Sequence, residues 1–190
     1  MAIDKITSAG ITTDAVGPTQ LNEAANYAFT GTVTGAGESN IPYFHAALEN
    51  DQTVSDNTMT KVQCNLEAFD SANAYDNSTN YRFTPQTAGK YFVYGQVRAN
   101  GSSNIYKIQL NLKVNGNNIT AGTYGYIGQS SFDVRGNTAS DPSVTSCGII
   151  TLNGSSDYLE LFAQVDVSSG TPYVFGSKSS YFGAYFLSST

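Results

Sequence analysis

Residues 83–97 read FTPQTAGKYFVYGQV, and the second half of this stretch has the spacing of a β-strand with two apolar faces. Tyr91 and Val93 fall on one face of the strand. Phe92 and Tyr94 fall on the other face. An antiparallel strand of a globular protein ordinarily shows one face to water. The second apolar face therefore needs a cover, and the rest of the sequence has to indicate what that cover is.

The composition is that of an all-β protein. The chain has 190 residues with 18 Gly, 13 Tyr and 10 Phe, and no stretch has the period of a long amphipathic helix. This length suffices for one domain with its own core. Charged residues make up 13% of the chain and the net charge is −6, with Lys and Arg scattered. We therefore expect no nucleic-acid partner and no membrane partner, since both call for clustered positive charge or a long apolar span.

From Pro42 onward, short apolar runs alternate with turns rich in Gly, Asn and Ser, and Asn115-Gly116 has the sequence of a tight hairpin. The runs predict an antiparallel jelly-roll sandwich of about ten strands. Candidate strands are Tyr43–Leu48, Thr60–Phe69, Tyr81–Thr84, Gly89–Val97, Ile105–Val114, Ile119–Tyr126, Ser143–Leu152, Tyr158–Val167 and Tyr181–Leu187.

Strict alternation assigns the faces of two of these strands. In residues 105–114 it places Ile105 on the polar face with Lys107, and Tyr106 on the apolar face with Ile108. The closing strand repeats the two-faced pattern of the opening stretch. Its first face carries Phe182, Ala184 and Phe186, and its second face carries Tyr181, Tyr185 and Leu187.

The segment FDSANAYDNSTNYRFTPQTAGKYFVYGQV resembles the signature of the globular head of complement subcomponent q, whose trimeric jelly roll is shared with tumour necrosis factor. Asp70, Tyr75, Phe83, Gly89 and Tyr91 match the pattern. The chain departs from it in the spacing between Tyr75 and Phe83, at Val93 and at Gly95. The segments PYFHAALEN, KVNGNNI, SCGIITLNGSSDYLEL and SYFGAYFLSST follow the family's order, so the resemblance covers residues 41–190.

This resemblance implies a homotrimer and offers a cover for the second apolar face. The core would receive Tyr91 and Val93, and the three-fold axis would receive Phe92 and Tyr94 together with Tyr181, Tyr185 and Leu187. An uncovered apolar patch of this size marks an interface in any case. Some relatives hold calcium near the axis, but no acidic cluster here matches such a site, and we expect no cofactor and no metal.

Residues 1–38 differ from the domain at 39–190, because they are poor in large apolar residues and end in the linker-like TGAGES. They resemble the N-terminal attachment segments of phage fibre and decoration proteins. We expect an arm that binds a major capsid protein or another virion protein. The anchoring residues would be Ile3, Ile6, Ile11, Val16, Leu21, Tyr27 and Phe29.

The sequence offers little for catalysis. Its one histidine, His45, lies on the polar side of an expected edge strand, where a surface or interface role outweighs a catalytic one. Turn geometry accounts for most of the Asp residues. We therefore expect no enzymatic activity. Cys64 and Cys147 are expected to be free thiols, although a disulfide between them is left open.

These observations favour a non-enzymatic structural protein on the surface of a tailed-phage virion. It would be a trimeric capsid decoration or cement protein, or a short head fibre, and location on the capsid or on the tail stays open. The first residues lack the pattern of a secretory signal, so release by lysis is expected. Two alternatives remain: a host-surface or glycan-binding knob of a tail fibre or adhesin, and a secreted cytokine-like ligand.

Overall fold

The computed structural model describes residues 41–100, 104–119, 125–127, 129–134, 137 and 139–190, and all regular structure within them is β. The prediction of an all-β antiparallel sandwich is confirmed. None of the described residues belongs to a helix long and apolar enough to cross a membrane. The strands are β1 Tyr43–Ala47, β2 Gln52–Thr53, β3 Thr60–Lys61, β4 Leu66–Asp70, β5 Tyr75–Asp76, β6 Arg82–Phe83, β7 Ala88–Asn100, β8 Ile105–Val114, β9 Asn117–Asn118, β10 Gly125–Tyr126, β11 Ser130–Asp133, β12 Ser143–Asn153, β13 Leu159–Val167, β14 Tyr173–Val174 and β15 Tyr181–Ser188.

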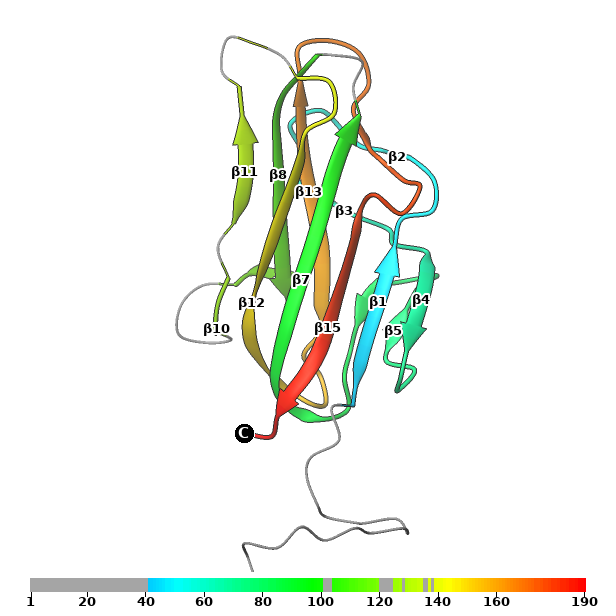
Figure 1. Cartoon of the computed structure of the whole chain (residues 1–190), viewed down its shortest axis with the longest axis vertical. Helices are drawn as coiled ribbons and strands as arrows, with labels where there is room; N and C mark the ends of the chain where they lie inside the picture. The colour runs from blue at the N-terminus through cyan, green and yellow to red at the C-terminus, as the bar shows by residue number, and fades with distance from the viewer. Residues whose placement is uncertain (1–40, 101–103, 120–124, 128, 135–136, 138) are drawn as a thin grey trace, which may run out of the picture. The chain divides into compact units, whose positions relative to one another are not determined.

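Two sheets form the sandwich (Figure 1). The eight-stranded sheet has the order β10-β12-β7-β15-β1-β4, with β14 attached to β7 and β2 attached to β14. The seven-stranded sheet has the order β11-β8-β13-β6-β5, with β3 attached to β13 and β9 to β8. The long strands β7 and β15 are neighbours at the centre of the first sheet, so the two strands with apolar faces lie side by side.

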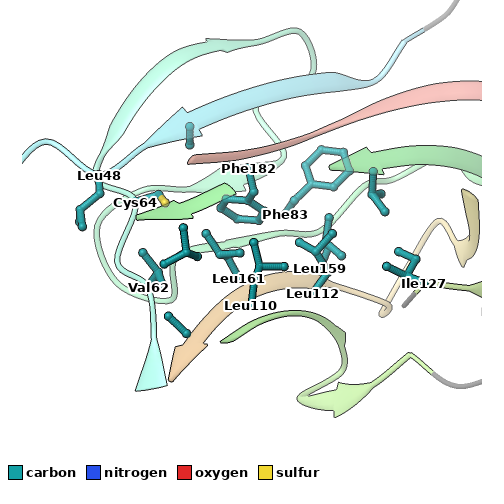
Figure 2. Packing of buried hydrophobic residues seen from close by; sticks show 14 of the residues in the cluster. Leu48, Val62, Cys64, Phe83, Leu110, Leu112, Ile127, Leu159, Leu161 and Phe182 are labelled. Atoms are coloured by element: carbon teal, nitrogen blue, oxygen red, sulfur yellow. The ribbon is translucent and has the colours of Figure 1, made fainter. Parts of the chain in front are cut away.

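The core lies between the sheets and is built from the inward face of each strand. Tyr91 and Val93 of β7 are fully buried there, as are Phe182 and Ala184 of β15. Leucines of β8 and β13 face these residues from the second sheet, and Figure 2 shows Leu110 and Leu161 across the core from Phe182. Burying one such large side chain contributes about 1.5–3 kcal/mol, so this layer supplies most of the stabilisation of the fold.

A stack of aromatic rings closes one part of the core. The Phe44 ring lies 4.3 Å from that of Phe83 and 4.9 Å from that of Tyr75, and it meets Phe182 edge-on at 5.1 Å. The Tyr75 hydroxyl donates to the backbone carbonyl of Cys64, which satisfies this buried polar atom. Offset and edge-on ring pairs of this kind add to the burial term.

Gly95 explains one departure from the family pattern. A Cβ at this position would lie 3.2 Å from a methyl group of Leu161 and 3.3 Å from one of Leu112. The leucines of the opposite sheet therefore occupy the space that a side chain at position 95 would need.

Most of the expected strands form, but the stretch Thr60–Phe69 is not one strand. It gives β3, which pairs with β13 in the seven-stranded sheet, and β4, which pairs with β1 in the eight-stranded sheet. The chain changes sheets between them, with Val62 and Cys64 both fully buried at the crossing. Of the expected strand Ile119–Tyr126 only Gly125–Tyr126 is a described strand, and residues 120–124 lie outside the described residues.

The expected faces of β8 are wrong at its start, because the strand contains a bulge. Asp166 pairs with Lys107 but Val167 pairs with Ile105, which leaves Tyr106 as an extra residue. The bulge turns Ile105 into the core, where it is fully buried, and leaves Tyr106 37% exposed. From Ile108 onward the expected apolar face is correct.

Candidate trimer interface

The outward face of the eight-stranded sheet carries rows of aromatic and apolar residues that cross several strands. In one row Tyr43 of β1 pairs with Tyr185 of β15, Tyr185 with Phe92 of β7, and Phe92 with Ile149 of β12. The adjacent row reads, strand by strand, Phe69, His45, Gly183, Tyr94 and Cys147. Because side chains two apart on a strand share a face, both rows lie on the same outer surface, called the aromatic face below.

Ring contacts hold the aromatic face together. Tyr94 lies at its centre, with ring centroids 6.0 Å from Phe92, 6.2 Å from Tyr185 and 6.4 Å from Tyr181. Tyr43 stacks on Tyr185 at 5.8 Å and meets Phe69 edge-on at 5.7 Å. Cross-strand aromatic pairs of this kind stabilise a sheet, and here they also fix the shape of its outer surface.

The single histidine belongs to this face. The ring of His45 is stacked beside that of Tyr94, and its Nδ1 lies 2.8 Å from the Tyr94 hydroxyl. Gly183 stands between them in the row, where an added Cβ would lie 2.4 Å from the Tyr94 hydroxyl oxygen and 2.6 Å from the Phe44 carbonyl oxygen. The missing side chain at position 183 therefore makes room for the Tyr94 hydroxyl to reach the imidazole across the β15 backbone.

Partial burial sets the protonation state of this pair. It lowers the pKa of His45, so the imidazole is neutral at pH 7. Burial, with the neighbouring Tyr185, raises the pKa of Tyr94, so its hydroxyl keeps the proton. The neutral pair is satisfied when the Tyr94 hydroxyl donates to Nδ1 of His45. A positive charge on the imidazole would remove this acceptor.

Much of the aromatic face stays open to solvent in one chain. Phe92 and Tyr185 are each 37% exposed, Phe69 is 39% exposed, and Ile149 is 51% exposed. Leu187 is 43% exposed at the end of β15, where a bulge follows Phe186. Monomeric proteins rarely leave a contiguous apolar surface of this kind uncovered.

The structure brings together four of the five residues predicted for the axis. Phe92, Tyr94, Tyr181 and Tyr185 lie in one connected set of rings. Leu187 is exposed beside them in sequence, but its register is shifted by the bulge. The predicted core positions Tyr91, Val93, Phe182, Ala184 and Phe186 are all buried, which confirms the face of each strand that was expected in the core.

Sequence reasoning missed other members of the face. Tyr43, Phe69 and Ile149 belong to it, and only the alternation around the buried Phe44 could have indicated Tyr43. The expectation that His45 lies on an edge strand is wrong, because β1 is flanked by β15 and β4. The proposed anchors Ile3, Ile6, Ile11, Val16, Leu21, Tyr27 and Phe29 lie outside the described residues.

The two cysteines and the acidic residues are the other candidates for chemistry. Both cysteines are free, Cys64 buried and Cys147 exposed. Within the described part of the chain, no three His, Cys, Asp or Glu residues come together as a metal site. The aromatic face is a surface suited to covering by another protein surface.

Comparison with known proteins identifies the fold. No protein-family model matches the chain, and no curated protein sequence matches it. Among solved structures, murine APRIL at pH 5.0 matches with a TM-score of 0.54 and 12% identity over 77% of this chain and 98% of that chain. Eiger TNF from S. frugiperda matches with a TM-score of 0.53 and 16% identity over 78% and 92% of the two chains. The domain therefore has a jelly-roll fold like that of tumour necrosis factor.

Proposed function

We propose that the protein is a non-enzymatic homotrimeric knob of a tailed-phage virion, in which three jelly rolls bury their aromatic faces against one another. The observation that carries the trimer is the aromatic face itself. Exposed Phe92, Tyr185 and Ile149 lie in one row, and a second copy offers them apolar cover. The similarity to APRIL and TNF structures supports this arrangement at the level of the fold.

The virion role rests on the N-terminal segment. Residues 1–38 have the composition of an attachment arm, and a trimer would carry three such arms. Three tethered arms bind more tightly than one, because the second and third contacts are made at high effective concentration. A capsid decoration or cement protein, or a short head fibre, would use both the trimeric knob and the three tethered arms.

Light scattering of the full-length protein with a matched pair of variants tests the trimer. Tyr185 and Tyr106 are both tyrosines and both 37% exposed, but only Tyr185 lies on the aromatic face. We expect a trimer for the wild type and for Tyr106→Asp, and a monomer for Tyr185→Asp, because three carboxylates would be buried close together without partners. A monomeric wild type, or a trimeric Tyr185→Asp variant, would contradict the proposal.

A secreted cytokine-like ligand is the second candidate, and the fold similarity to murine APRIL and Eiger TNF favours it. The two candidates share the trimer and differ in location. Mass spectrometry of purified virus particles separates them. The virion proposal requires the protein at a fixed ratio to the major capsid protein, whereas a ligand would be found only in the particle-free fraction.

A further inference from the structure

A small polar pocket, whose lining shares no residue with the aromatic face, lies between the segment after β1 and the segment that crosses between the sheets. Its volume is about 170 Å³. The lining consists of the amide side chains of Asn50, Gln52, Gln63 and Asn65, the carboxylate of Asp51, and two apolar surfaces from Leu48 and Tyr81. None of these described lining residues is a lysine or an arginine. A pocket of this size holds one small ring rather than an extended ligand.

Some of the lining side chains form hydrogen bonds to the backbone around the pocket. The Gln52 side chain donates to the Lys61 carbonyl and accepts from the Gln63 backbone N–H, both at 2.8 Å. Asn65 accepts from the Glu49 backbone N–H at 3.1 Å. One oxygen of Asp51 accepts from the Gly176 backbone N–H at 2.8 Å. These hydrogen bonds fix the positions of Gln52, Asn65 and one Asp51 oxygen.

Other polar groups of the lining do not hydrogen-bond to the described residues. In the part of the chain that the structure describes, the side-chain amides of Asn50 and Gln63, the second Asp51 oxygen and the Tyr81 hydroxyl make no hydrogen bond to the protein. Two amides supply both donors and acceptors, and the carboxylate supplies an acceptor. Asn50, Asp51 and Gln63 are exposed, so these polar groups are open to solvent and available to a ligand.

The backbone at Tyr81 is strained in a way that places its ring at this pocket. Its φ is 51°, in the left-handed region that a bulky side chain seldom adopts. Neighbouring bonds hold it there: the Asp76 carboxylate accepts from the backbone N–H groups of Thr79 and Asn80, and the Lys61 ammonium donates to the Asn80 carbonyl at 3.1 Å. Strain that the surroundings maintain in this way points to a function of the residue that bears it.

We propose that this pocket binds one ring of a neutral saccharide. Each sugar hydroxyl both donates and accepts, which matches the free amides and the free carboxylate oxygen, while the C–H face of the ring suits the apolar face of Tyr81. The carboxylate of Asp51 and the absence of a cation in the lining disfavour acidic sugars. The pocket lies within one chain, so the inference does not rest on the trimer, although three copies would strengthen weak binding.

The test uses the full-length protein on an array of immobilised neutral oligosaccharides built from glucose, galactose, mannose or N-acetylglucosamine, beside sialylated counterparts. We expect binding to a subset of the neutral ones, reversed by the free saccharide. Two variants should weaken binding at least tenfold: Gln63→Ala, which removes a free amide, and Tyr81→Gly, which removes the ring while suiting the positive φ. Gln86→Ala, an exposed amide outside the pocket, should bind like the wild type.

Three results would overturn the inference. They are no binding to any neutral oligosaccharide, binding only to the sialylated ones, and binding that neither Gln63→Ala nor Tyr81→Gly weakens. Thermal unfolding of each variant shows that the domain is folded, and Asn50→Ala replaces Tyr81→Gly if that variant does not fold. Because light scattering measures the trimer separately, failure here leaves the proposed assembly standing, and a monomeric protein that binds saccharide leaves the pocket standing.

Discussion

The contact of His45 and Tyr94 depends on the lack of a side chain at position 183. We expect Gly183→Ala to lower the free energy of unfolding by about 1–3 kcal/mol, because the new methyl group meets both a backbone carbonyl of β1 and the Tyr94 hydroxyl. Denaturant unfolding of the variant measures the effect. Gly116→Asn is the control, since an added Cβ there meets nothing within 4 Å and Asn tolerates its φ of 74°. Equal stabilities for Gly183→Ala and the wild type would contradict the contact.

His45 makes the aromatic face sensitive to acid. Its pKa is lowered by burial, so between that value and about 6.5 the unfolded chain binds a proton that the folded chain does not. The contribution of neutral His45 to the free energy of unfolding is therefore complete above about pH 6.5. It falls as the pH drops toward the pKa of His45 in the folded chain. His45 is the only histidine, so a fall in stability between about pH 7 and pH 5 is assigned to it.

The measurement for His45 is the free energy of unfolding from pH 5 to pH 8, for the wild type and for His45→Gln. The glutamine keeps a polar side chain but carries no titrating group, so its profile should be flatter over this interval. Burial of the face in a trimer would steepen the wild-type profile further. Parallel profiles for the two proteins would show that another group is responsible.

At the scale of elements, a strand could be predicted where the alternation of its residues shows which face is buried in the core. β7 and β15 carry large apolar residues on both sides, and their core faces follow from simple alternation. The start of β8 could not be predicted, because the bulge at Tyr106 depends on pairing with β13 rather than on local sequence. The change of sheet between β3 and β4 could not be predicted for the same reason, since residues 60–69 (TKVQCNLEAF) alternate apolar and polar residues as one continuous strand would.

The candidate site was predicted to a similar extent. The outward residues of β7 and β15 were predicted correctly, because the sequence of each strand carries apolar residues on both faces. Phe69 and Ile149 were not found, because they join the aromatic face only through the pairing of β4 with β1 and of β12 with β7. The polar pocket was not found at all, since its lining comes from three separate segments and Tyr81 reveals its role only through its backbone conformation.

The loop between β5 and β6 depends on Asp76. Its carboxylate accepts hydrogen bonds from the backbone N–H groups of Thr79, Ser78 and Asn80, which hold its pKa well below its usual range. We expect Asp76→Ala to cost about 1–2 kcal/mol, as loss of a capping side chain does, and Asp76→Asn to cost less because it keeps one acceptor. The carboxylate contributes above the unfolded pKa of about 4, and its contribution is lost as the pH falls through the folded pKa.

Thermal unfolding at pH 7 of both Asp76 variants checks this prediction. The melting temperature should fall in the order wild type, Asp76→Asn, Asp76→Ala. Equal melting temperatures for the wild type and Asp76→Ala would mean that the loop keeps its shape without the carboxylate.

For the whole molecule, the trimer predicts a difference between the two thiols. Cys64 is fully buried in the core, whereas Cys147 is exposed in the row of Tyr94, on the face that assembly would cover. We expect Ellman's reagent to react slowly with the wild type and with Tyr106→Asp, and to titrate one thiol at least tenfold faster in Tyr185→Asp. Fast reaction of one thiol in all three proteins would mean that the aromatic face is open in the assembled molecule.

The last prediction separates the knob from its arm. The core residues in the described part of the chain all lie between Phe44 and Phe186. We therefore expect a protein lacking residues 1–38 to unfold within about 2 °C of the full-length melting temperature and to form the same oligomer. If the arm is the attachment device, this truncated knob will not bind particles that lack the native protein, whereas the full-length protein will restore normal occupancy. Truncated knobs that still decorate such particles fully would move the attachment site to the jelly roll itself, because no anchor from Ile3 to Phe29 would then be needed.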